Sequence, residues 1–158
     1  MTIEDIEIAV AKHWDIRAHV IVPNASWGAG VHECDLLILS TSNYLTEVEI
    51  KTSKADLAKD LKKQHGHRSE KIKRLYYAIP DTVLNKNGTQ GLIPENAGII
   101  RIWKSEYGGH SCSVEREATA NKNAKPLNED ERFQVARLGA IRIWDLKKRL
   151  QSVREAMK

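Results

Sequence analysis

The sequence has little of what marks secreted or membrane proteins. It contains only two cysteines, Cys34 and Cys112, which lie far apart and form no CxxC pair. A reduced, cytoplasmic compartment is therefore the expected location. No stretch approaches the roughly 20 apolar residues that a bilayer-spanning helix needs, and the acidic, amphipathic N-terminus is unlike a secretory signal. We therefore expect a cytoplasmic protein without a membrane partner.

The composition indicates one globular domain with a modest excess of basic residues. The 158 residues are enough for a single domain, 1–158, with a proper core, and the hydrophobic fraction of 41% is ordinary. Lysine and arginine number 25 against 21 aspartates and glutamates. This excess fits a polyanionic partner such as DNA, although many proteins without such a partner share it.

The apolar pattern predicts helices interleaved with strands. The first half should contain a helix over 2–14, strands over 18–23, 33–40 and 44–52, a helix from Ser53, and a strand over 75–79. The second half should contain a short helix near 81–86, a hairpin over 98–104 and 110–116, a basic linker over 117–127, and a helix over 128–156. This order is typical of an α/β or α+β fold in which helices cover a sheet.

The two long helices carry capping residues and apolar stripes. Thr2 with Asp5 and Asn128 with Glu131 match the capping-box spacing. Glu7 falls inside the apolar stripe of the first helix, and an acid on a core-facing side requires a reason. The apolar stripe of the first helix consists of Ile3, Ile6, Val10 and Trp14. The predicted buried side of the last helix consists of Phe133, Ala136, Ala140, Trp144 and Leu150. The sequence shows no exposed apolar seam that would mark an interface.

The most informative stretch of the chain is Glu47-Val48-Glu49-Ile50-Lys51. Side chains alternate along a strand, so the two acids and the lysine should project together. The preceding run 36–39 is apolar on both faces and reads as a buried central strand, with Glu33 and Asp35 at its entrance. Uncompensated buried charge costs several kcal/mol per ion. A hard divalent cation such as Mg²⁺ is the simplest compensation, because it binds carboxylate oxygens.

The alternative interpretation of this stretch needs no metal. The same alternating charges could lie on an exposed edge strand and form cross-strand ion pairs. In either case, Glu33 and Glu47 fit the rim of a site better than they fit metal ligands.

Together these residues resemble the PD-(D/E)XK nuclease superfamily. Asp35 followed after 14 positions by Glu49-Ile50-Lys51, within a predicted αβββαβ core, is the pattern of that superfamily. The stretch 49–57 is similar to small bacterial and phage-borne members, including MmcB-type proteins proposed as repair endonucleases. The resemblance covers residues 2–80 and implies a restriction-endonuclease-like core with a mixed central sheet; the hairpin and last helix, within 98–158, would be additions. Cys34 stands where the superfamily name has proline.

The resemblance implies a metal-dependent deoxyribonuclease. Asp35, Glu49 and the carbonyl of Ile50 would hold Mg²⁺ or Mn²⁺, which would activate a water molecule for phosphodiester hydrolysis. Lys51 would orient that water or offset charge in the transition state, and Glu7 matches an accessory acid of the family. The activity would serve DNA repair, recombination or phage DNA processing. Members are often dimers, so the resemblance allows a homodimer.

A basic segment after the second predicted helix is the candidate DNA contact. Its residues are His65, His67, Arg68, Lys71 and Lys73, and Ser53 would present a helix N-terminus to a phosphate. A solvated basic loop is an equally good interpretation. The two histidines could also suggest Zn²⁺, but no further ligands stand at a suitable spacing.

Two rival functions remain beside the nuclease. One is a DNA-binding module that keeps the fold without cutting, although clustered acids repel DNA unless a metal intervenes. The other is a structural or protein-interaction domain in which the acids form ion pairs.

Overall fold

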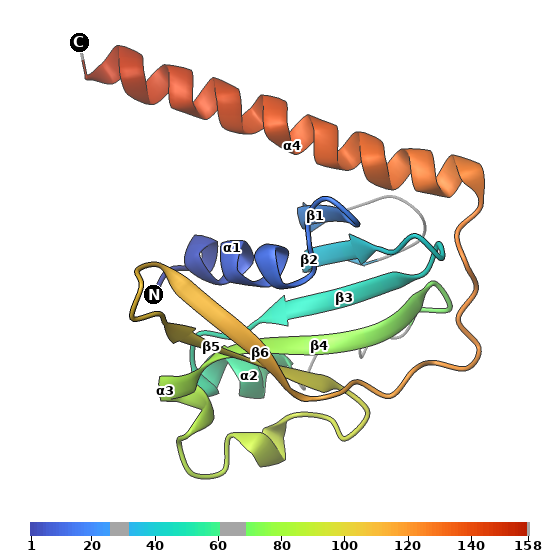
Figure 1. Cartoon of the computed structure of the whole chain (residues 1–158), viewed down its shortest axis with the longest axis vertical. Helices are drawn as coiled ribbons and strands as arrows, with labels where there is room; N and C mark the ends of the chain where they lie inside the picture. The colour runs from blue at the N-terminus through green and yellow to red at the C-terminus, as the bar shows by residue number, and fades with distance from the viewer. Residues whose placement is uncertain (26–31, 61–68, 158) are drawn as a thin grey trace.

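Within the part of the chain that the structure describes, six strands form one open, mixed sheet whose spatial order follows the sequence. The computed structural model describes residues 1–25, 32–60 and 69–157. The strands are β1 Val20–Ala25, β2 Cys34–Leu39, β3 Leu45–Ile50, β4 Ile72–Pro80, β5 Gly98–Lys104 and β6 His110–Arg116. The pairs β1–β2, β2–β3 and β5–β6 are antiparallel, whereas β3–β4 and β4–β5 are parallel. The expected α+β architecture, a mixed sheet flanked by helices, is therefore present (Figure 1).

Helices occupy the two crossovers and both ends of the chain. They are α1 Ile3–His13, α2 Lys54–Asp60, α3 Asp81–Leu84, the 3₁₀ turn η1 Gln90–Leu92, and α4 Glu129–Ala156. α2 lies in the β3–β4 crossover, and α3 with η1 lies in the β4–β5 crossover. Both predicted capping boxes, at Thr2 and at Asn128, are confirmed. Among the described residues, no helix combines the length and apolar character needed to cross a membrane.

The two faces of the sheet carry separate cores. On one face, α1 buries Ile6, Ala9 and Val10 against the middle of the sheet, where Trp14 meets Tyr76 edge-to-face. The opposite face holds two apolar clusters. One joins β1, β2 and α4 through residues such as Val22 and Leu138, and the other joins β4, α2 and α3. Glu47 and Glu49 project from β3 between these two clusters, because their strand neighbours are Leu37 on one side and Leu75 and Tyr77 on the other.

Several predicted boundaries shift for identifiable reasons. β1 extends to Ala25 and includes Pro23, which an edge strand tolerates because one side of its backbone needs no partner. β4 begins at Ile72 rather than Leu75 because Ile72 is buried against Leu45. The hairpin matches its predicted bounds, and its turn uses two glycines at positive φ, Gly108 and Gly109.

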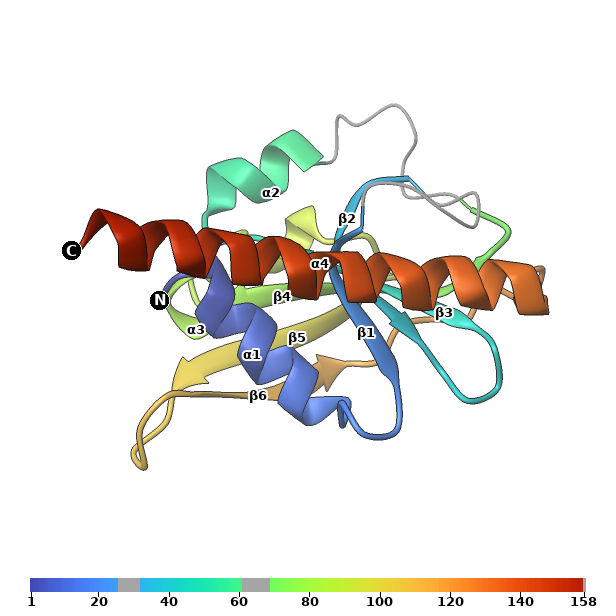
Figure 2. The same ribbon diagram turned by 90° about the horizontal axis from the view of Figure 1, so that it is seen from above.

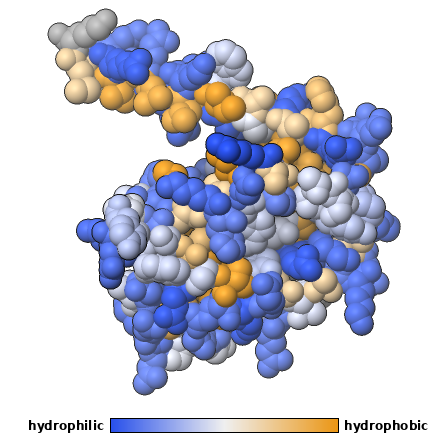
Figure 3. All heavy atoms as spheres, viewed as in Figure 1, coloured by the Kyte–Doolittle hydropathy of each residue, from blue (hydrophilic) through white to orange (hydrophobic). Residues whose placement is uncertain are grey.

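The predicted buried side of α4 is wrong. Phe133 and Trp144 are 67% and 62% exposed, whereas Val135 and Leu138 are buried. Within the described residues, α4 packs on the edge strand β1 through its first half, and from Ile143 to Met157 every residue but Asp145 is exposed. This projecting part lies apart from α1 and the sheet in Figure 1 and crosses over α1 in Figure 2. Apolar side chains line the projecting part, so the expectation that no apolar seam is exposed is wrong as well (Figure 3). In α1, the outermost residue of the predicted stripe, Ile3, is exposed.

Candidate active site

The charged residues of β3 lie in the interior of the fold. Glu47, Glu49 and Lys51 are 0%, 2% and 5% exposed, and the strand alternation puts them on one face as predicted. β3 lies between β2 and β4. The alternative of an exposed edge strand is therefore wrong, and so is the expectation that Glu47 lies at a rim.

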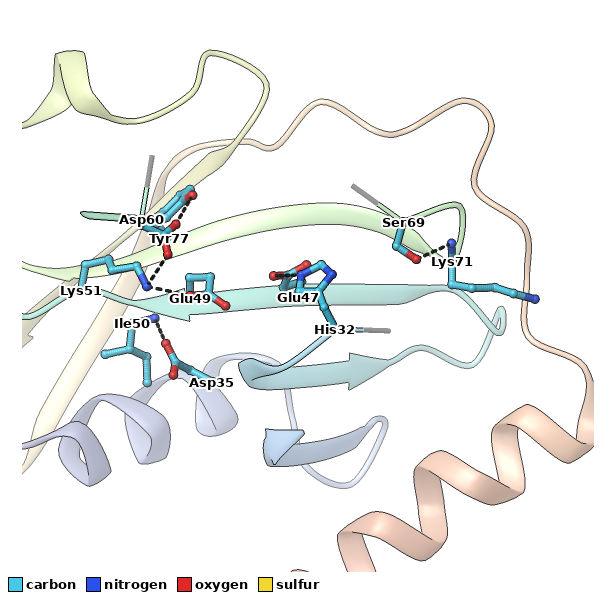
Figure 4. A network of polar contacts seen from close by, with 10 residues as sticks. All are labelled: His32, Asp35, Glu47, Glu49, Ile50, Lys51, Asp60, Ser69, Lys71 and Tyr77. Carbon is cyan, nitrogen blue, oxygen red and sulfur yellow. Dashed lines mark hydrogen bonds and ion pairs between the residues drawn. The ribbon is translucent and has the colours of Figure 1, made fainter. Parts of the chain in front are cut away.

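Lys51 joins two buried carboxylates. Its Nζ lies 2.6 Å from Glu49 Oε2 and 3.1 Å from Asp60 Oδ1 (Figure 4). Asp60, at the end of α2, is 4% exposed and accepts a 2.7 Å hydrogen bond from the Tyr77 hydroxyl of β4. The network thus connects the end of β3 to the helix that follows it and to the neighbouring strand.

These contacts keep Lys51 charged. Burial acts to lower the pKa of the Lys51 ammonium, but the hydrogen bond and charge of Glu49, together with those of Asp60, outweigh burial and raise the pKa. Burial and the hydrogen bond to Asp60 raise the pKa of the Tyr77 phenol. At neutral pH, Lys51 is therefore a hydrogen-bond donor and a positive charge, and cannot act as a base.

Asp35 reaches the same end of β3 from β2. The regular β2–β3 pairing ends where Leu36 meets Val48. Beyond that point the Asp35 side chain, rather than the backbone of β2, bonds to β3: its Oδ2 accepts a 2.7 Å hydrogen bond from the backbone N–H of Ile50 (Figure 4). Asp35 is thereby bonded to the residue that stands between Glu49 and Lys51.

Negative charge gathers around this point. Burial raises the pKa of the Cys34 thiol, and the charges of Glu47, Glu49, Asp35 and Glu33 raise it further. On the α1 side, burial raises the pKa of Glu7, the charges of Glu4 and Asp35 add to the effect, and a hydrogen bond from Asn24 opposes it. The charge of Asp35 therefore reaches Glu7 on the first helix, which places the two acids on neighbouring elements.

The donors at this site suit a hard divalent cation. Asp35 and Glu49 offer carboxylate oxygens and Ile50 a backbone carbonyl, which is the donor chemistry of Mg²⁺. Lys51 supplies a single positive charge beside the carboxylates of Glu49 and Asp60. In the arrangement seen here, no group of three or more His, Cys, Asp or Glu side chains within 1–25, 32–60 and 69–157 has metal-binding geometry. A bound metal would therefore share Glu49 with the Lys51 ammonium.

Two of the candidate DNA contacts, Lys71 and Lys73, lie away from this site. Lys71 pairs with Glu131 at 2.7 Å, and the Lys73 ammonium lies over the Tyr44 ring. Both lysines lie at or just before the start of β4, which pairs with the start of β3 at Leu45. Lys51 follows the opposite end of β3, so the length of that strand, ~20 Å at about 3.3 Å per residue, separates the two lysines from Lys51.

Of the remaining candidates for DNA contact, the structure describes Ser53 alone. The Ser53 hydroxyl accepts a hydrogen bond from the Asp56 N–H and so caps α2, which has only seven residues. His65, His67 and Arg68 lie outside the described residues.

Sequence reasoning missed three members of the site. Asp60 is three residues after Leu57 and therefore shares the inner face of α2, which is the same signal that drew attention to Glu7. Tyr77 alternates with Tyr76 and could have been assigned to the Glu49 face once β4 was paired with β3. His32, whose Nε2 lies 2.9 Å from Glu47 Oε1, left no pattern, because loop residues have no periodicity.

Comparison with known proteins supplies a fold without a function. No family model and no curated protein matches the chain. Among solved structures, the chain is similar to the SPO1766 protein from Silicibacter pomeroyi, a protein of unknown function. The match has a TM-score of 0.59 at 21% identity and covers 94% of this chain and 88% of the other. At this identity the likeness supports a shared fold alone.

Proposed function

We propose that this protein is a metal-dependent DNA endonuclease of the PD-(D/E)XK type. The observation that carries the proposal is the bond from the Ile50 N–H to Asp35, which brings Asp35, Glu49 and Lys51 to one end of β3. The element order α1-β1-β2-β3-α2-β4 also agrees with the αβββαβ core that the resemblance implies. Repair, recombination and phage DNA processing are the roles that suit such an enzyme.

Each residue of the site has a chemical role in this proposal. Asp35, Glu49 and the Ile50 carbonyl hold Mg²⁺ or Mn²⁺, which supplies Lewis-acid activation of water and of the phosphoryl oxygen. Lys51 remains protonated and donates hydrogen bonds that position the nucleophile and offset charge on the phosphate. Asp60 and Tyr77 orient Lys51, and Glu7 adds a carboxylate near Asp35.

The proposal is tested by incubating the purified chain with supercoiled, branched and single-stranded DNA in Mg²⁺, in Mn²⁺ and in EDTA. We expect metal-dependent cleavage that Asp35→Asn and Lys51→Ala each abolish. Lys122→Ala serves as the matched control, because Lys122 is an exposed lysine of the 117–127 segment. Cleavage that survives both site variants would show that the assignment of the site is incorrect.

A non-catalytic DNA-binding module is the second candidate. It is favoured by the position of the Lys51 ammonium, which already occupies an oxygen of Glu49 that a metal would need. This candidate predicts salt-sensitive DNA binding that is unchanged by EDTA, and no cleavage with any metal.

A further inference from the structure

The last helix is much longer than the surface on which it packs. α4 has 28 residues, which at about 1.5 Å each span ~42 Å. Its anchoring residues end early: Val135 and Leu138 are buried, Gly139 lies close to Val22, and Arg142 donates a hydrogen bond to the Asn24 carbonyl. From Ile143 to Met157 every residue but Asp145 is exposed. This projecting part lies apart from α1 and the sheet in Figure 1, and in Figure 2 it crosses over α1 and ends beyond the other elements.

The projecting part of α4 carries a regular apolar seam. Its side chains recur at spacings of three, four, three and four, and they are 48–83% exposed. They are Ile143, Leu146, Leu150, Val153 and Met157. In the space-filling view, apolar atoms follow one side of the projecting helix, the side that faces open space below it (Figure 3). This spacing is that of heptad positions a and d, which pack against a second helix.

The width of the seam distinguishes between classes of partner. An a/d-only stripe is the narrow seam of helix pairing, whereas a helix that lies in a lipid interface needs a broader apolar face. At 100° per residue, the seam residues all lie within about 40° of the direction of Gly139. The two largest apolar residues off the seam, Phe133 and Trp144, lie roughly 120° and 140° from that direction. The geometry therefore favours a protein helix over a membrane surface.

The charges beside the seam restrict the partner further. The positions that flank an a/d seam are e and g, and here their charged residues are all basic: Arg142, Lys147, Arg149 and Arg154. A second copy of this chain would bring like charges together in either orientation, and a seam of about two heptads is short for a pair that must overcome that repulsion. Acidic flanks on the partner would instead convert each contact into an attractive one.

We propose that the projecting half of α4 is a docking surface for an amphipathic helix of another protein, with leucine-like residues on its apolar face and glutamates or aspartates beside them. The docking surface is separate from the Asp35–Glu49–Lys51 site. It holds whether or not that site cleaves DNA.

The test uses the full chain and a labelled synthetic peptide of three heptads, with leucine at a and d and glutamate at e and g. Fluorescence anisotropy should show binding with a Kd in the range of about 1–100 µM, weakened by salt. The double variant Leu146→Ser/Leu150→Ser should weaken binding about tenfold or more. Phe133→Ser, a change at an exposed apolar residue off the seam, should leave binding unchanged. Circular dichroism should show that both variants fold, because the substituted residues are exposed.

Three results would overturn the proposal. The first is absence of peptide binding, or equal binding by the seam variant. The second is equal binding of a matched peptide with lysine at e and g. The third is failure of the acidic peptide to bind together with a different role for the seam. Loss of self-association in sedimentation on changing the seam would assign it to a second copy, and loss of binding to anionic phosphatidylserine vesicles would assign it to a membrane.

Discussion

Replacing Lys51 with methionine tests the buried charge network directly. The Lys51 ammonium contacts Glu49 and Asp60 at 2.6 and 3.1 Å, and all three residues are at most 5% exposed. Removing one partner of a buried ion pair leaves uncompensated charge and costs about 3–5 kcal/mol. At about 2–4 °C per kcal/mol for a chain of this length, we expect Lys51→Met to lower the melting temperature by roughly 6–20 °C in EDTA.

The same variant reports on the metal. With Lys51 gone, a divalent cation becomes the available compensation for the acids, so Mg²⁺ should restore stability to Lys51→Met more than to the wild type. Saturation at 100 times the dissociation constant would restore about 2.7 kcal/mol. The raised pKa of Lys51 means that its stabilisation is complete below the unfolded value of 10.5 and is lost only as pH rises through the folded value. The gap between variant and wild type should therefore be constant from neutral pH down to mildly acidic pH.

Urea unfolding followed by tryptophan fluorescence measures both effects, with Lys122→Met as the exposed control. The double variant Lys51→Met/Asp60→Asn should lose less stability than the summed losses of the two single variants. The reason is that Asp60→Asn removes one of the two carboxylates that Lys51→Met leaves without a positive partner. A Lys51→Met protein no less stable than Lys122→Met would refute the buried network. A Lys51→Met protein that is destabilised but gains nothing from Mg²⁺ would refute the metal site and leave the ion pairs intact.

Three further predictions concern neighbouring positions. The pKa of Glu7 is raised, so the native state loses stability as pH rises from about 4.5 through the folded pKa. Glu7→Gln should remove that loss in urea unfolding at pH 4 and pH 7, and it should also lower any metal-dependent cleavage. A Glu7→Gln protein less stable than the wild type at pH 7 would contradict this prediction. Tyr77→Phe removes a donor from buried Asp60 and should cost about 1–3 kcal/mol in urea unfolding; a cost within error of zero would show that the bond does not form. Gly98→Ala would place its Cβ 2.2 Å from Tyr76 Cδ1, and the overpacking should cost about 1–3 kcal/mol, with a neutral melting temperature as the contrary result.

Local patterns were sufficient for the elements and for the centre of the site. Alternation along β3 placed Glu49 and Lys51 on one face because that periodicity is a property of the backbone itself. The hairpin bounds matched because two adjacent glycines at positive φ define the turn, and the capped helix starts matched because a cap is a contact between residues three apart.

What the sequence could not supply are contacts between distant segments. The bond from Ile50 to Asp35 depends on where the β2–β3 pairing stops, and Asp60 reaches Lys51 only because α2 folds back over the sheet. The buried side of α4 failed for a related reason. Its apolar residues form more than one stripe at helical spacing, and the position of β1 selects the stripe that contains Val135 and Leu138.

The placement of the acids between two apolar clusters bears on why the charges persist there. Glu47 and Glu49 project between the apolar clusters of β2 and β4, and leucines at these two positions would join the clusters into one continuous core. The two glutamates therefore cost the fold apolar packing as well as the hydration of their charges. Replacing such ion pairs with apolar residues of similar volume is often neutral or stabilising. A region that a more stable core could occupy, but that holds converging carboxylates and one lysine, is a candidate for a chemical role rather than a stabilising one. The structural rival, in which the ion pairs exist to stabilise the fold, predicts instead that Glu49→Leu/Lys51→Met/Asp60→Asn, which removes all three charges of the network, lowers stability at every metal concentration.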